Sequence, residues 1–172
     1  RHILQGEEDR ALMLKAEFVN GIDKLKQYGY TYDILIFPDQ LKYAEEFAAM
    51  FPDQLLVLDH IAKPDIKNGA IDQWKKDIAE LARHKNVYCK VSGMVTEADW
   101  KHWKTDDFNP YLDVVFEAFG VERLMYGSDW PVCLVAATYN QVVGLMEQYT
   151  LKLSPNEQAM FWGGNATKFY NL

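Results

Sequence analysis

A short apolar run ends in a carboxylate and an imidazole: Gln54-Leu55-Leu56-Val57-Leu58-Asp59, followed by His60. The run does not alternate between apolar and polar residues, which is typical of a strand buried on both faces of a sheet. Four further runs of the same kind lie along the chain, at residues 3–4, 32–37, 86–91 and 123–127. The sequence therefore predicts five buried strands.

The segments between these runs carry apolar residues at helical spacing. One helix is predicted to begin at Asn109, as N-cap, with Pro110 at the first helical position. Another is predicted from Ser154 to about Phe169, because Ser154 and Glu157 form a capping-box pattern. The remaining helical stripes cover residues 71–82, 112–119 and 139–146.

This alternation of strand and helix predicts an α/β fold with a parallel sheet of right-handed βαβ units. Two architectures compete, an open doubly wound sheet and a (β/α)₈ barrel. A complete barrel takes about 250 residues, whereas this sequence has 172 residues and only five predicted strands. A barrel built from these residues is therefore incomplete.

The composition is that of one globular domain or part of one, with 49% hydrophobic and 25% charged residues. A net charge of −7 argues against a nucleic-acid partner, since phosphates attract basic surfaces. No apolar run approaches the roughly 18–20 residues of a membrane span. Two isolated cysteines, Cys89 and Cys133, fit a reducing compartment, and the chain shows no signal peptide, so a cytoplasmic location is predicted.

Polar residues follow several of the predicted strands, at the edge of a parallel sheet where ligands bind. Asp129 follows the fifth strand and suits a general base acting on water or a metal ligand. The alternative is a turn residue ahead of Pro131. His60 follows the third strand and suits a metal ligand, a group polarising a carbonyl or a proton shuttle, with a purely structural histidine as the alternative.

Lys90 lies within the otherwise apolar run 86–91. A lysine buried there must be paired or functional. It could stabilise an oxyanion or a carboxylate, or become a carbamylated metal bridge. A structural ion pair, for example with Asp59, is an equal alternative. The sequence contains neither His-x-His nor His-Glu-x-x-His, and one histidine with one aspartate does not complete a zinc site.

Three phrases resemble amidohydrolase family 2 and, within it, the hydrolases of sugar lactones. They are Leu58-Asp59-His60-Ile61-Ala62-Lys63-Pro64, Val87-Tyr88-Cys89-Lys90-Val91-Ser92-Gly93-Met94 and Arg123-Leu124-Met125-Tyr126-Gly127-Ser128-Asp129-Trp130-Pro131-Val132. The resemblance implies an incomplete TIM barrel in which residues 1–172 are the C-terminal part of a single domain of the metal-dependent-hydrolase type. The five runs then correspond to strands four to eight, and the His-x-His that the family carries on strand one is not among these residues.

The resemblance also implies an activity, the opening of a sugar-acid lactone of the L-fuconolactone or L-rhamnonolactone type. In such lactonases the strand-eight aspartate, here Asp129, activates water, and His60 stabilises the oxyanion. Arg1, Lys90 and Trp130 are the expected substrate contacts. Either no cofactor is required or one divalent metal such as zinc binds, with His60 and Asp129 as its ligands in this chain.

Three alternatives stay open at this point. The first is a zinc-dependent decarboxylase or amide hydrolase of the same superfamily, which chelation would inactivate. The second is a non-catalytic α/β binding module, and the third is an inactive truncated fragment. The expected partner is a small-molecule sugar lactone, with no nucleic acid and no membrane. Because an open half-barrel leaves two sheet edges unpaired, a homo-oligomer is also expected.

Overall fold

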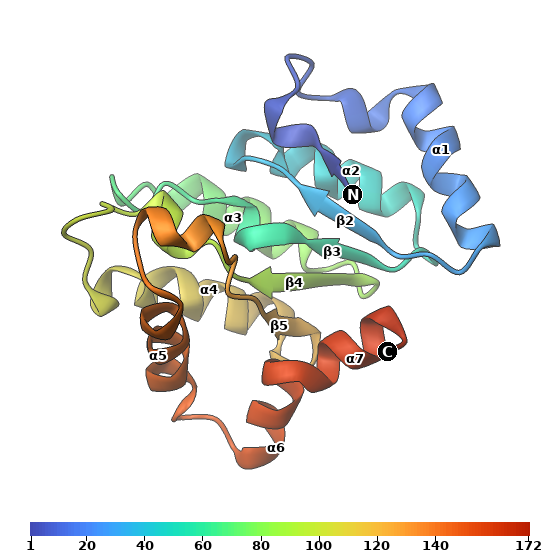
Figure 1. Ribbon diagram of the computed structural model, residues 1–172. Coiled ribbons are helices and arrows are strands. Elements are labelled where there is room, and N and C mark those ends of the chain that lie inside the picture. Colours follow the sequence, from blue (N-terminus) through green and yellow to red (C-terminus); the bar gives the residue numbers. More distant parts are fainter.

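The computed structural model describes residues 1–172 and contains one sheet of five parallel strands (Figure 1). Each strand pairs with the next one along the chain, so that Leu58 of the third lies opposite Ile34 of the second and Cys89 of the fourth. A doubly wound sheet reverses its strand order, and this one does not. The strands are β1 (His2–Ile3), β2 (Tyr32–Leu35), β3 (Leu56–Leu58), β4 (Val87–Val91) and β5 (Leu124–Tyr126).

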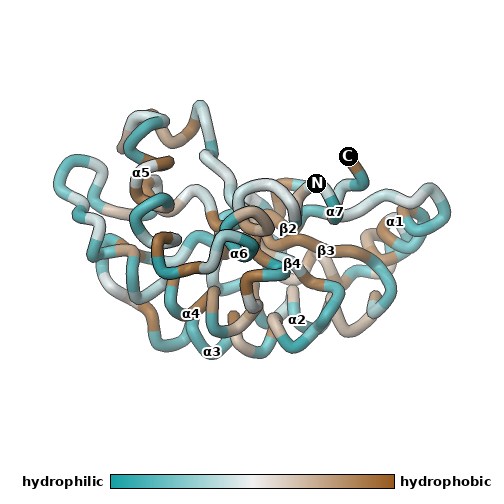
Figure 2. The backbone as a smooth tube through the Cα atoms, turned by 90° about the horizontal axis from the view of Figure 1, so that it is seen from below, coloured by the Kyte–Doolittle hydropathy of each residue, from teal (hydrophilic) through white to brown (hydrophobic).

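Helices connect the strands and cover one face of the sheet. Figure 2 shows α2, α3 and α4 side by side along that face, with α7 and both chain ends on the other side of the strands. None of the helices has the length and apolar character that crossing a membrane requires. The helices are α1 (Ala16–Gln27), α2 (Leu41–Met50), α3 (Asp72–Leu81), α4 (Asn109–Phe119), α5 (Tyr139–Thr150), α6 (Pro155–Ala159) and α7 (Asn165–Tyr170).

The strands bury side chains on both faces, as their apolar runs predict. Leu56 and Leu58 of β3 belong to the main core that the helices cover. Val57, which points the opposite way, packs with Met125 and with Phe169 of α7 in a second, smaller cluster. The face opposite the helices is therefore partly covered by the end of the chain.

The structure confirms the predicted parallel α/β sheet and its five strands but changes some boundaries. The first strand begins and ends one residue earlier than predicted, and β2 ends at Leu35. Asn109 is not an N-cap. It is the first residue of α4, and its side chain donates to Asp106 instead (3.2 Å).

The predicted last helix begins with the expected capping box, since Ser154 Oγ accepts from the Glu157 amide and Glu157 accepts from the Ser154 amide. It is not one continuous α-helix. A wider π-helical turn, Met160–Gly164, separates α6 from α7. At Gly164 a Cβ would lie 3.1 Å from the Ala159 carbonyl oxygen, which is a tight contact. Glycine at this position lets the backbone of the π-helical turn approach Ala159 closely.

Candidate active site

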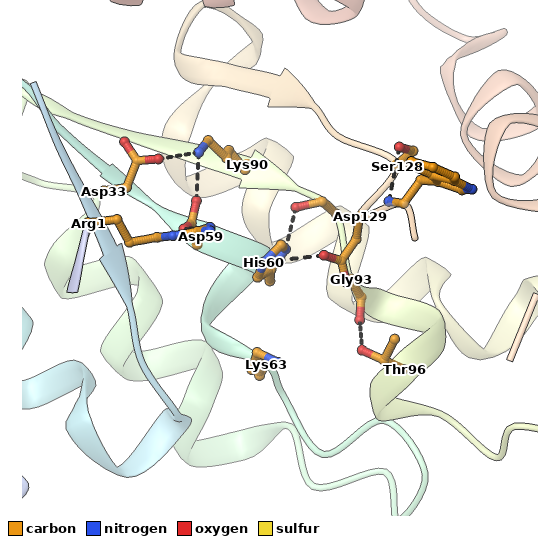
Figure 3. A network of polar contacts seen from close by, with 12 residues as sticks. Arg1, Asp33, Asp59, His60, Lys63, Lys90, Gly93, Thr96, Ser128 and Asp129 are labelled. Carbon is orange, nitrogen blue, oxygen red and sulfur yellow. Dashed lines mark hydrogen bonds and ion pairs between the residues drawn. The ribbon is translucent and has the colours of Figure 1, made fainter. Parts of the chain in front are cut away.

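The ends of β3 and β5 bring His60 and Asp129 together at one edge of the sheet (Figure 3). Ser92, which follows β4, lies within hydrogen-bond distance of His60. His60 Nε2 lies 3.6 Å from Asp129 Oδ1, and the two side chains are only 12% and 13% exposed. The two residues predicted to carry the chemistry are thus neighbours, because parallel strands end on the same side of their sheet.

The other ring nitrogen of His60 is held by Ser92. The distance from His60 Nδ1 to Ser92 Oγ is 2.8 Å. Two glycines allow this close packing, since a Cβ on Gly93 would meet the His60 side chain at 3.0 Å and one on Gly127 would meet Ser92 Cβ at 3.0 Å. Ser92 is not among the site residues predicted from the sequence, although a Ser-Gly pair directly after a strand marks a position where the backbone turns closely around a neighbour.

The backbone at this edge adopts an uncommon conformation. Residues 60–63, which we call the left-handed segment, all have positive φ, from 46° to 58°, and Asp129 has a φ of 56°. None of these residues is glycine. The left-handed conformation costs an L-residue about 1–2 kcal/mol, and such strain is found most often at functional sites.

The environment of His60 favours the uncharged ring. Burial lowers the pKa of His60, and the carboxylates of Asp129 and Asp59 oppose that effect only in part. The imidazole is therefore neutral at neutral pH, with Nδ1 toward Ser92 and Nε2 toward Asp129.

A second polar cluster lies beside His60 on the face opposite the helices (Figure 3). Asp59 is fully buried between two cations, at 3.1 Å from Arg1 Nη1 and 2.8 Å from Lys90 Nζ. Lys90 also contacts Asp33 Oδ2 at 2.6 Å, and the Tyr170 hydroxyl lies 3.0 Å from Asp33 Oδ1. The ion pair with Asp59 was one of the alternatives for Lys90.

These contacts keep Lys90 charged. Burial alone would lower its pKa, but the attraction of Asp59 and the hydrogen bonds that Lys90 donates to Asp33, Asp59 and Tyr170 outweigh that effect and raise the pKa of Lys90. Asp33 and Tyr170 are not among the site residues predicted from the sequence. Asp33 was detectable as a carboxylate inside an apolar strand, whereas no local pattern links Tyr170 to residues so distant in the chain.

Trp130 follows Asp129 and is 62% exposed at the rim of the site. Its backbone amide donates to Ser128 Oγ at 3.2 Å. The indole is free to contact a bound molecule, and its role as a substrate contact stays a prediction.

The residues present do not form a complete metal site. His60 and Asp129 supply two donors, and the structure contains no group of three His, Cys, Asp or Glu side chains placed to hold an ion. A catalytic zinc ion takes three protein ligands. The metal that the resemblance implied as an option does not fit these residues by themselves.

Comparisons with known proteins identify similar sequences and a similar fold. The sequence profile of amidohydrolase family 2, described as "Amidohydrolase", matches residues 4–172. The chain is 42% identical to an L-fucono-1,5-lactonase of Burkholderia multivorans, over 100% of the chain and 62% of the relative. It is 26% identical to an L-rhamnono-gamma-lactonase of Scheffersomyces stipitis, over 90% of the chain and 53% of the relative.

A crystal structure of an amidohydrolase from Burkholderia multivorans with bound zinc superimposes with a TM-score of 0.96 at 42% identity. The match covers 100% of this chain and 63% of that one. The chain thus spans between about half and two thirds of the length of these relatives. The profile match over nearly all residues and the shared fold establish that the chain belongs to amidohydrolase family 2.

Proposed function

We propose that the protein, at its natural full length, hydrolyses a sugar-acid lactone of the L-fuconolactone or L-rhamnonolactone type. The observation that carries this proposal is the pairing of Asp129 and His60, 3.6 Å apart and mostly buried where the parallel strands end. Relatives named as L-fucono-1,5-lactonase and L-rhamnono-gamma-lactonase support the choice of substrate class.

The chemistry follows from the two side chains. Asp129 takes a proton from water, which attacks the lactone carbonyl and leaves negative charge on the carbonyl oxygen. When the Ser92 hydroxyl is the donor in its contact with His60 Nδ1, the neutral ring carries its proton on Nε2, from which it stabilises that oxyanion. Asp129 then returns its proton to the ring oxygen as the carbon–oxygen bond breaks, and the product is an open hydroxy acid.

The substrate contacts are Arg1, Lys90 and Trp130. Arg1 is half exposed and reaches the site from beside Asp59, which orients its guanidinium. Trp130 offers an exposed aromatic face next to the base. Lys90 is held by Asp33 and Asp59, so it contributes charge to the site while the carboxylates fix its position.

The five strands form strands four to eight of an eight-stranded barrel, and residues 1–172 are the C-terminal part of that single domain. The continuous strand order supports this arrangement. So does the greater length of the relatives, which leaves room for the other strands.

A second candidate is a zinc-dependent decarboxylase or amide hydrolase of the same superfamily, which the zinc in the related crystal structure favours. Chelation separates the two. Lactone hydrolysis that persists after dialysis against a chelator supports the metal-free reaction. Loss of hydrolysis, restored by zinc, supports the second candidate.

The direct test is Asp129→Asn in the full-length protein, which keeps the shape of the side chain but removes the base. We expect hydrolysis of L-fuconolactone to fall by about a hundredfold or more. Asp53→Asn is the matched control, because Asp53 pairs only with Lys26 at the surface. Turnover that is unchanged in Asp129→Asn would contradict the role of Asp129 and favour a binding module.

A further inference from the structure

The left-handed segment carries four consecutive side chains in a conformation that glycine normally occupies. One of them, Ile61, is fully buried. Its β-branched side chain makes the left-handed conformation still less favourable. Non-glycine residues visit this region singly rather than in runs. The surrounding structure must therefore hold the segment in place.

Trp74 of α3 supplies such a contact. Its indole Nε1 donates to the Ile61 carbonyl oxygen at 2.9 Å, and both residues are buried. The indole packs against Tyr111 of α4, with ring centroids 5.3 Å apart, so that its own position is set by the helical layer. A right-handed Ile61 would turn its carbonyl away and leave a buried indole N–H without a partner, which is unfavourable.

His60 is the first residue of the left-handed segment, so its ring follows any change in the segment. The ring already touches Ser92, and the backbone of Gly93 lies against it. With these neighbours in place, only a narrow set of ring positions keeps His60 Nε2 facing Asp129. A change in the backbone at Ile61 would move the ring out of that set.

We propose that Trp74 is a positioning residue, which holds His60 toward Asp129 through the left-handed segment although it lies in the helical layer on the other face of the sheet. This inference rests on the proposed lactonase function. It goes beyond that function because it assigns control of the site to a side chain that touches neither substrate nor the reacting atoms.

Trp74→Phe in the full-length protein tests the proposal, since it keeps an aromatic ring and removes the N–H donor. A misplaced catalytic group lowers the rate of the chemical step more than substrate binding, so we expect kcat for L-fuconolactone to fall about tenfold to a hundredfold with little change in KM. Tyr111→Phe is the matched control. It removes the hydrogen bond of the neighbouring ring to the Asp65 carbonyl, outside the left-handed segment, and should leave kcat within about threefold.

Two further readouts separate positioning from a general loss of stability. In protein carrying ¹⁵N-labelled histidine, Trp74→Phe should shift the imidazole signals of His60 and leave those of His84 and His102 in place. Adding Ala62→Gly to Trp74→Phe should restore part of kcat, because glycine adopts the left-handed conformation without steric cost. A purely structural tryptophan would not be rescued by that change.

The outcomes are distinct. A wild-type protein without lactonase activity would refute the proposed function, while the His60 signals would still test the positioning. A folded Trp74→Phe with normal kcat and unchanged His60 signals would overturn the inference. If Trp74→Phe does not fold, Ala62→Val strains the same segment in a protein that keeps Trp74 itself. It should lower kcat and shift the His60 signals, and normal values for both would equally overturn the inference.

Discussion

The hydrogen bond between Ser92 Oγ and His60 Nδ1 is 2.8 Å long and lies where Ser92 is almost completely buried. Ser92→Ala removes it and leaves one ring nitrogen without its partner. We expect kcat for lactone hydrolysis to fall about tenfold, because the proton is no longer kept on Nε2 and the ring is free to turn. Steady-state kinetics measure the effect, with Ser154→Ala, a helix cap far along the chain, as the control. Equal rates for wild type and Ser92→Ala would show that Ser92 does not orient His60.

Asp59 is fully buried and depends on two cations, of which Lys90 is the closer at 2.8 Å. Lys90→Met retains most of the side-chain volume but leaves Asp59 and Asp33 without that charge. We expect the free energy of unfolding to drop by about 3–5 kcal/mol, the usual cost of breaking a buried ion pair from one side. Urea denaturation checks this value. Lys26→Met removes an exposed pair with Asp53 and should cost less than about 1 kcal/mol. Similar costs for the two variants would contradict a buried role for Lys90.

At the scale of elements, α7 is attached to the beginning of β5 by one side chain. Asn165 Nδ2 donates to the carbonyl oxygens of Val121 (2.7 Å) and Leu124 (2.6 Å), and Asn165 is 4% exposed. Asn165→Ala leaves two carbonyls without this donor, so we expect a loss of about 1–3 kcal/mol in the free energy of unfolding. Asn156→Ala, at an exposed position of α6, is the control. An unchanged urea midpoint in Asn165→Ala would mean that α7 is held by Phe169 packing alone.

At the scale of the whole molecule, β1 and β5 are the outer strands, and each has one edge without a partner strand. Ile3 of β1 is an apolar residue that is 60% exposed. Such edges pair with other chains. We therefore expect residues 1–172, produced as an isolated segment, to associate as concentration rises, as measured by light scattering, whereas the full-length protein shows a defined mass. A segment that remains a 19.9 kDa monomer at every concentration would contradict the proposal that these edges close a barrel.

Much of this architecture was predictable from local patterns. Five apolar runs, with helical apolar stripes between them, predicted the parallel α/β sheet. They could do so because the spacing of apolar residues along a strand or helix indicates which of its faces is buried. The nearness of His60 and Asp129 followed as well, since parallel strands end on one side. The choice between a doubly wound sheet and a continuous strand order did not follow, because the same runs suit both.

Long-range contacts decided the rest. The Tyr170 hydroxyl donates to Asp33, which lies 137 positions earlier in the chain. The Trp74 indole donates to the left-handed segment, which contains no glycine that would have predicted its conformation. The final helix is interrupted by the π-helical turn Met160–Gly164, where a Cβ at Gly164 would lie 3.1 Å from the Ala159 carbonyl oxygen. The amino-acid sequence alone determined which stretches are buried and which polar residues follow them. Only the packed tertiary structure decided how those residues are oriented, because a buried polar or strained group persists only where partners from other elements stabilise it.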